Sequence, residues 1–418
     1  MQFGKPNHRT NMWNTKSAEL SFNLRGLSAA GFILPKQGRL SSKRIVWLLA
    51  VQIPYILIHI LAAIDFFVQP FNLRKLLVTL FLTNNGFQTV VRPLHIFIYR
   101  HRLRDFLQTI NKVPDSLSEQ FNSAERKMRE HSKKRIFRFN FILYSYNVSA
   151  YAVIFILAVV RCVKIAYCDD KTRLTELEFC THLSTPLYIY DFWWFSDPLV
   201  LPTFYYLYAF NISMIGVYYS IFCASDSFNC SVFVALAERC KFLAQTAPKA
   251  LLPDRRGQIT PFFTAWIKYH QQYQELVLSG NKIFGPVVFV THVFAALNAM
   301  VYTFFVINDS EDTIRSLSMA NLLGLAIQFY MYAYAGQQII NKSEELSRAT
   351  LTASQVASGA YSDGPARSAL CVVMARCCGS KNDEISGLGY FNISMRFYAR
   401  IMSVSATYIL FTQQLNSK

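Results

Sequence analysis

Seven long hydrophobic segments alternate with polar, charged segments along the chain. Each has roughly the 20 residues that an α-helix needs to cross the hydrocarbon core of a bilayer. The segments span residues 45–68, 76–99, 139–163, 199–224, 283–307, 317–340 and 390–414. This pattern predicts an all-α, polytopic membrane protein with seven transmembrane helices.

The last hydrophobic segment carries polar residues at helical spacing. Arg400, Ser403, Thr407 and Gln414 fall near one face of the predicted helix. Unsatisfied polar groups in hydrocarbon cost several kcal/mol each, so this stripe is expected to face protein or water. Two interpretations follow: a polar seam packed against neighbouring helices, or one wall of an aqueous pore.

The composition agrees with a membrane protein and argues against other classes. Hydrophobic residues make up 52% of the chain, with 35 Phe and 23 Tyr, which is unusual for a soluble domain. The net charge of +17 resides at the ends of the predicted helices, so it does not indicate nucleic-acid binding. The nine cysteines lack metal-ligand spacing, and the chain has no nucleophile elbow or phosphate loop. We therefore expect membrane lipid as a partner, no nucleic acid, no metal or other cofactor, and no catalytic residues.

The distribution of Lys and Arg predicts the orientation. Residues 1–44 carry many basic residues against a single acid, Glu19, and residues 100–135 are again rich in Lys and Arg. The segment after the third span mixes basic residues with several acids. Because Lys and Arg accumulate in cytoplasmic loops, the N-terminus is expected inside and the C-terminus outside. A G-protein-coupled receptor has the opposite orientation.

Several motifs in the C-terminal half resemble insect odorant receptors. At the end of the sixth span, Gly336-Gln337 precede the element Ser343-Glu344-Glu345-Leu346. Residues 389–394, GYFNIS, are similar to the start of that family's pore helix, and Thr407-Tyr408 with Gln414 resemble its terminal signature. The family's Asp after the fourth span and His before the fifth have counterparts in Asp226 and His270.

The resemblance implies a tetrameric cation channel in the plasma membrane of olfactory sensory neuron dendrites. The cytoplasmic segment between spans four and five is shorter than that of the shared co-receptor. The chain is therefore expected to be an odorant-tuned subunit whose partners are the co-receptor, a small volatile odorant and permeant cations. The implied domains begin with a cytoplasmic N-terminal segment (residues 1–44), transmembrane helices 1–4 with the odorant pocket (45–225) and a cytoplasmic helical connection (226–282). They continue with transmembrane helices 5–6 (283–340), a cytoplasmic anchor (341–389) and a pore-lining helix (390–414).

By the same resemblance, the last helix lines the pore. Phe411 is expected at a hydrophobic constriction that closes the pore by dewetting, and Gln414 near its outer mouth, with Thr407, Ser403 and Arg400 further along the helix. A cationic ring would repel permeant ions, so Arg396 or Arg400 is expected to turn toward cytoplasmic water or a carboxylate.

The odorant pocket is expected among the outer halves of spans two, three, four and six, because a small apolar ligand needs a closed aromatic site with few hydrogen bonds. For each candidate, ordinary helix packing or lipid contact is the competing interpretation. The candidates are Phe81, Asn84, Tyr151, Phe155, Phe204, Tyr205, Tyr208, Asn321 and Phe329.

Two other functions stay open at this point. A gustatory receptor channel shares the Thr-Tyr and Gln ending, and a secondary transporter is the second class, although the spans hold few acids and no repeat. The sequon at Asn308 lies in a predicted external loop and is the expected glycosylation site. Cys168 and Cys180 share another external loop, where either a disulfide or two free thiols fit.

Overall fold

The computed structural model describes residues 20–30, 32, 46, 53, 73–111, 119–167, 201–253, 259–308, 312–358, 364–379 and 384–416. Most of the first predicted span, residues 45–68, and most of the N-terminal segment lie outside these ranges, as do Cys168 and Cys180.

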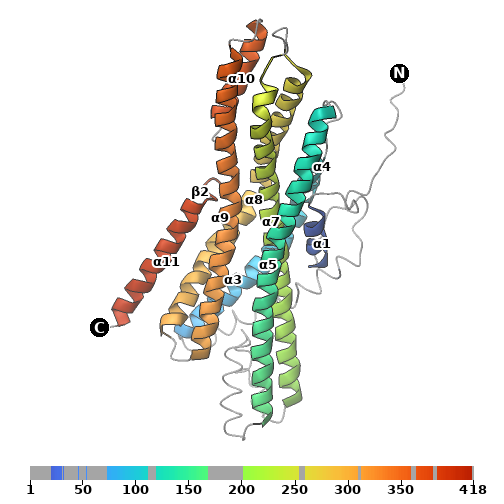
Figure 1. The fold of residues 1–418 in the computed structure, drawn as a ribbon. Coiled ribbons are helices and arrows are strands. Elements are labelled where there is room, and N and C mark those ends of the chain that lie inside the picture. Colours follow the sequence, from blue (N-terminus) through green and yellow to red (C-terminus); the bar gives the residue numbers. More distant parts are fainter. Residues whose placement is uncertain are drawn as a thin grey trace.

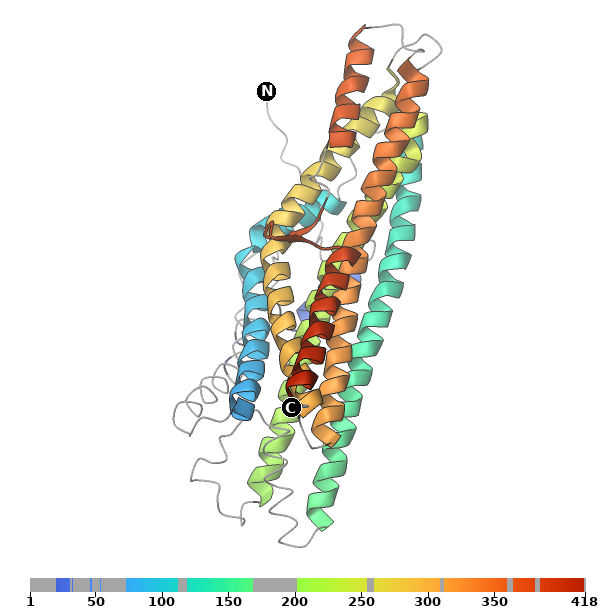
Figure 2. The ribbon, with the colours of Figure 1, turned by 90° about the vertical axis from the view of Figure 1, so that its left-hand side faces the viewer.

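Long helices form an elongated bundle (Figures 1 and 2). They are α3 (Leu73–Ile98), α5 (Glu119–Tyr167), α7 (Leu201–Ala250), α8 (Pro261–Asn308) and α9 (Asp312–Ser358). Shorter helices are α1 (Ser21–Ala29), α4 (Arg100–Asn111) and α10 (Gly364–Gly379), and α11 (Met395–Asn416) runs along one side of the bundle. The described parts of the predicted spans from the second onward are helical, except for the first residues of the last span.

Two described helical stretches, Ser220–Ala250 and Pro261–Asn308, are long and apolar enough to cross a membrane. The apolar part of the first stretch is 94% buried within the protein. Its small residues, such as Ala235 and Ala247, allow close packing against neighbouring helices. The apolar character of this half of α7 therefore reflects a protein core rather than lipid contact.

The helices continue without a break beyond the predicted spans. Residues 226–246 extend α7, and residues 266–278 form part of α8. At the upper end of Figure 1 these extensions pack with α9, which also contacts α10. The indole of Trp266, fully buried there, donates a hydrogen bond to the Leu243 carbonyl at 3.1 Å. The connection expected between spans four and five is thus built from prolonged helices.

The short helix α1 docks on α5 and α7 through a buried amide–hydroxyl cluster. Asn140 on α5 donates to Asn23 Oδ1 at 3.0 Å, and Asn23 donates to Ser227 Oγ at 2.8 Å. The hydroxyls of Ser227 and Ser231 donate to Asn140 Oδ1. Each of these polar groups is buried and partnered, so the cluster positions α1 specifically.

The segment before α11 is a β-hairpin, which corrects the prediction that the last helix begins near residue 390. Strands β1 (Ser386–Gly387) and β2 (Phe391–Asn392) pair antiparallel. Leu388 and Gly389 make the turn with φ of 52° and 81°, a left-handed conformation that interrupts a right-handed helix. Asn281 on α8 holds the first strand, since it accepts from Ser386 N at 2.9 Å and donates to the Glu384 carbonyl. The GYFNIS motif therefore forms part of the hairpin and ends directly before α11, and it is not helical.

Candidate functional site

A buried cluster of polar side chains joins α3, α7, α8 and α9. Arg92 on α3 is 1% exposed, and its guanidinium lies 2.8 Å from the carboxylate of Asp226 on α7. The same guanidinium lies 3.5 Å from the side-chain oxygens of Gln88 and Thr291, and it covers the ring of Phe222. A buried charge without a partner is costly, so each member of the Arg92–Asp226 pair depends on the other.

Asp226 also binds α9. Gln328 Nε2 donates to Asp226 Oδ2 at 2.7 Å, and the Tyr332 hydroxyl donates to Oδ1 at 2.8 Å. Asn229, one turn along α7, donates to the Tyr332 hydroxyl at 3.0 Å. One carboxylate therefore links α7 to both α3 and α9.

His292 on α8 connects this cluster to the hairpin and to α11. The centroid of its ring lies 5.1 Å from that of Tyr332, 5.6 Å from Phe391 and 5.8 Å from Phe397. His292 Nδ1 lies 2.8 Å from the Val288 carbonyl oxygen, which makes Nδ1 the protonated ring nitrogen. The His292 ring therefore packs between α9 on one side and the hairpin and first turn of α11 on the other.

The Gly336-Gln337 motif forms the joint between α9 and α11. A Cβ atom on Gly336 would collide with the carbonyl oxygen of Ile393, so only glycine allows this approach. Gln337 Oε1 accepts a hydrogen bond from Met395 N at 3.1 Å, and Ser394 Oγ accepts one from Phe397 N at 3.2 Å. Both oxygens cap backbone donors that the first turn of a helix leaves unpaired.

A second polar contact ties the helices together further along the bundle. Arg135 on α5 pairs with Glu238 on α7, and its guanidinium lies 3.2 Å from both the Tyr334 hydroxyl and Gln338 Oε1 on α9. Burial by itself lowers the pKa of Arg135, but the hydrogen bonds and the charge of Glu238 outweigh it, so the pKa lies above its usual value. Arg135 therefore stays charged at physiological pH.

The residues predicted to line a pore lie on α11, which contacts α8 and α9. Arg400, Ser403, Thr407 and Gln414 are exposed in the single chain, and so is Phe411, at 58%. The Thr407 hydroxyl donates to the Ser403 carbonyl at 3.0 Å. Within the part of the chain that the structure describes, the polar stripe is therefore not buried against neighbouring helices.

The structure describes the side chains of some predicted pocket residues and not of others. Asn84 is buried and donates to Asn298 and to the Phe294 carbonyl on α8, while its own Oδ1 is buried without a donor. Phe329 packs against His292, with ring centroids 5.3 Å apart. Tyr151 lies against Gly216 of α7 and Asn321 is half-buried on α9. The side chains of Phe81, Phe155, Phe204, Tyr205 and Tyr208 lie outside the described part of the structure.

Comparison with models of protein families assigns the chain to a family. The family model described as 7tm Odorant receptor matches residues 72–406, which include every described long helix and most of α11. The chain belongs to the odorant receptor family. This assignment confirms the family resemblance found in the sequence, and membership of a receptor family confirms the prediction that the chain is not an enzyme.

Solved structures of an insect olfactory receptor share the fold of this odorant receptor chain. OR5 from Machilis hrabei in complex with eugenol has a TM-score of 0.74 at 14% identity, covering 94% of this chain and 96% of the other. A second structure of OR5 from the same organism has a TM-score of 0.73 at 12% identity with the same coverage. A comparison with curated proteins gives no match.

Sequence reasoning missed several residues of the site in this odorant receptor chain. Arg92 and His292 stand inside hydrophobic segments, where a basic residue signals an internal partner. That signal was available, but the identity of the partner was not. Asn281 lies just before the predicted fifth span, and amides are common near helix ends. Nothing in the sequence therefore indicated that Asn281 binds the hairpin.

Proposed function

We propose that this chain is an odorant-tuned receptor subunit that binds a small, mostly apolar volatile compound and opens a non-selective cation pore. The single observation that carries the proposal is the position of α11. It stands at the side of the bundle with both polar and apolar residues exposed, as a helix shared between a pore and neighbouring subunits requires.

The proposed assembly is a tetramer with the odorant receptor co-receptor, in the plasma membrane. Seven spans, an internal N-terminus and an external C-terminus follow from the hydrophobic segments and the Lys and Arg distribution. In this orientation the upper end of Figure 1 is cytoplasmic. The helical extensions there, together with residues 341–389, would anchor the subunits.

The proposed ligand is small and largely apolar. A similar structure contains eugenol, a small aromatic compound. Asn84 Oδ1, buried without a donor, offers one acceptor to a ligand hydroxyl. Phe329 and Tyr151 are the other candidates with described side chains, together with Asn321.

Ligand binding is proposed to act on α11 through α8 and α9. The Arg92–Asp226 cluster, His292 and the Gly336–Ile393 contact form a continuous packed path from the pocket helices to the first turn of α11. A ligand that favours the open arrangement by a few kcal/mol shifts the population of the pore.

Whole-cell recording tests this function. Cells expressing the chain with and without the co-receptor would be exposed to a panel of volatile compounds. A fast cation current that requires both subunits supports the proposal. Stoichiometric solute uptake into sealed vesicles, or responses that depend on a G protein, would contradict it.

A further inference from the structure

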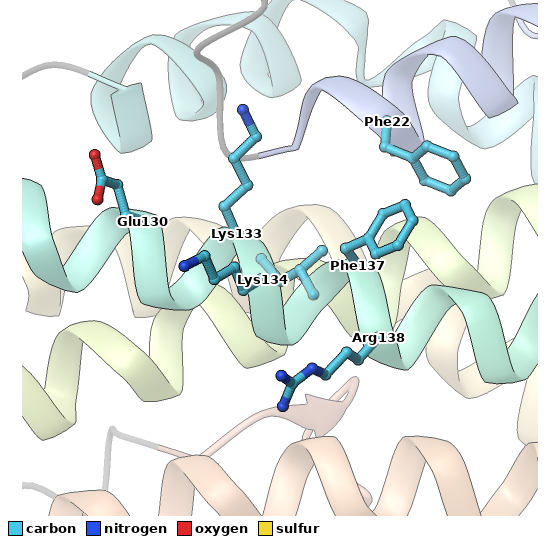
Figure 3. Close-up of a pocket in the computed structure, with 7 residues that line it drawn as sticks. Phe22, Glu130, Lys133, Lys134, Phe137 and Arg138 are labelled. Atoms are coloured by element: carbon cyan, nitrogen blue, oxygen red, sulfur yellow. The ribbon is translucent and has the colours of Figure 1, made fainter.

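A groove lies on the exposed side of α5, next to α1 (Figure 3). Its volume is about 440 Å³. Its lining residues come from these two helices and are basic or apolar, with a single acid among them. They are Phe22, Glu130, Lys133, Lys134, Ile136, Phe137 and Arg138.

The exposed face of α5 changes from charged to apolar over about two helical turns. Lys133, Lys134 and Arg138 are exposed, and the exposed apolar positions begin with Phe137 at 55% and continue with Phe141 at 64%. The Phe22 ring of α1 packs edge-on against Phe137, with centroids 5.8 Å apart, and is itself 44% exposed. In Figure 3 these two rings lie together, toward the end of the groove away from Glu130.

This boundary coincides with the predicted entry of the chain into the membrane. The hydrophobic segment of α5 begins at residue 139, and the basic residues directly precede it. The buried face of α5 does not change in this way, because Ile136 and Phe139 both belong to the core. The exposed charges are therefore not required by packing within the chain.

The basic groups differ from Arg135 beside them. Arg135 turns inward and pairs with Glu238, whereas Lys134 and Arg138 have no acidic partner within the described residues. Exposed cations at the cytoplasmic surface of a membrane attract anionic lipid, while aromatic side chains beside them contact acyl chains.

We propose that the α1–α5 groove binds an anionic phospholipid of the cytoplasmic leaflet. Its phosphate contacts Lys134 and Arg138, and an acyl chain lies over Phe137 and Phe22. The assignment to the cytoplasmic leaflet rests on the proposed orientation of the subunit.

Binding can be measured on the purified full-length chain in detergent with dioctanoyl phosphatidylserine, using thermophoresis of a labelled C-terminal tag. The test variant is K134Q/R138Q. The control is R126Q/K127Q, which removes one Arg and one Lys from exposed positions on the same helix, further from the membrane. Elution from a sizing column verifies the fold of both.

We expect the test variant to bind about 25-fold more weakly, because each basic residue near an anionic membrane contributes about fivefold. The control is expected to bind within about twofold of the parent chain, since its charges lie more than a Debye length away. Equal effects of the two double substitutions, or no effect of either, would overturn the proposal.

Two further probes define the ligand. Dioctanoyl phosphatidylcholine should bind more weakly than the serine lipid, because it carries no net charge. Glycerophosphoserine, which has no acyl chains, should compete poorly with the lipid. If it competed as well as the lipid, the groove would bind an anion alone, and the proposed contact with an acyl chain would be overturned. Because binding in detergent does not depend on membrane orientation, an external N-terminus would overturn only the leaflet assignment.

Discussion

The guanidinium of Arg92 and the carboxylate of Asp226 meet at 2.8 Å although 134 residues separate them in the chain. Their side chains are 1% and 7% exposed. The pair joins the second predicted span to the residues directly after the fourth, and the Tyr332 hydroxyl extends the contact to α9. Three of the helices that carry pocket candidates, α3, α7 and α9, are thus linked at one buried charged site.

Replacing Asp226 by Asn should destabilise the chain by about 3–5 kcal/mol, because Arg92 would remain as an uncompensated buried charge. The measurement is the melting temperature of the detergent-purified chain. Asp105→Asn is the control, since Asp105 pairs with Arg104 at 3.3 Å on the surface and is 66% exposed. Its loss should change stability by less than about 1 kcal/mol. Equal melting temperatures of the two variants would show that the buried pair contributes nothing.

Gly336→Ala should displace the hairpin and the start of α11. The new Cβ atom meets the backbone carbonyl of Ile393, which has no flexible end to move aside. We expect a loss of odorant-evoked current together with lower thermal stability.

Gly280→Ala provides the matched control for this effect. A Cβ atom there would contact Phe106 at 3.7 Å and Leu236 at 3.8 Å, both ordinary distances. Because alanine favours a helix by up to about 1 kcal/mol over glycine, this variant should be as stable as the parent chain or more stable. Normal currents from Gly336→Ala would rule out a close joint between α9 and the hairpin.

Phe411→Ala should raise the basal current several-fold in cells that also express the co-receptor. Removing the ring from an apolar constriction lets water and ions remain in the closed pore. Leu410→Ala is the control, because Leu410 is next in the chain and equally exposed, at 60% against 58% for Phe411. If Leu410→Ala raised the basal current and Phe411→Ala did not, the constriction would lie on a different face of α11.

Glycosylation should occur at Asn308 and not at Asn392. Asn308 at the end of α8 and Asn392 on the hairpin are both exposed, but the proposed orientation places only Asn308 outside. Glycosidase treatment should shift the parent chain and Asn392→Gln on a gel, and leave Asn308→Gln unchanged. A shift that survives Asn308→Gln and disappears with Asn392→Gln would reverse the orientation.

The sequence by itself determined the class of this protein. Hydrophobic length and the distribution of Lys and Arg predict helices and an orientation because both properties act on each segment separately. The Gly336-Gln337 and Thr407-Tyr408 motifs led to the odorant receptor family, which the family comparison confirms. The roles of Phe411 and Gln414 in a pore and of Asn308 in glycosylation stay predictions.

Only the tertiary structure decided which residues meet. A charged residue in an apolar segment shows that a partner exists, but the choice of Asp226 for Arg92 depends on how α3 and α7 cross. The hairpin before α11 likewise depends on Asn281, more than one hundred residues earlier. Periodicity along a chain reports which face of a helix is buried. The partner on the other side of that contact is fixed by packing between distant segments, which no local pattern contains.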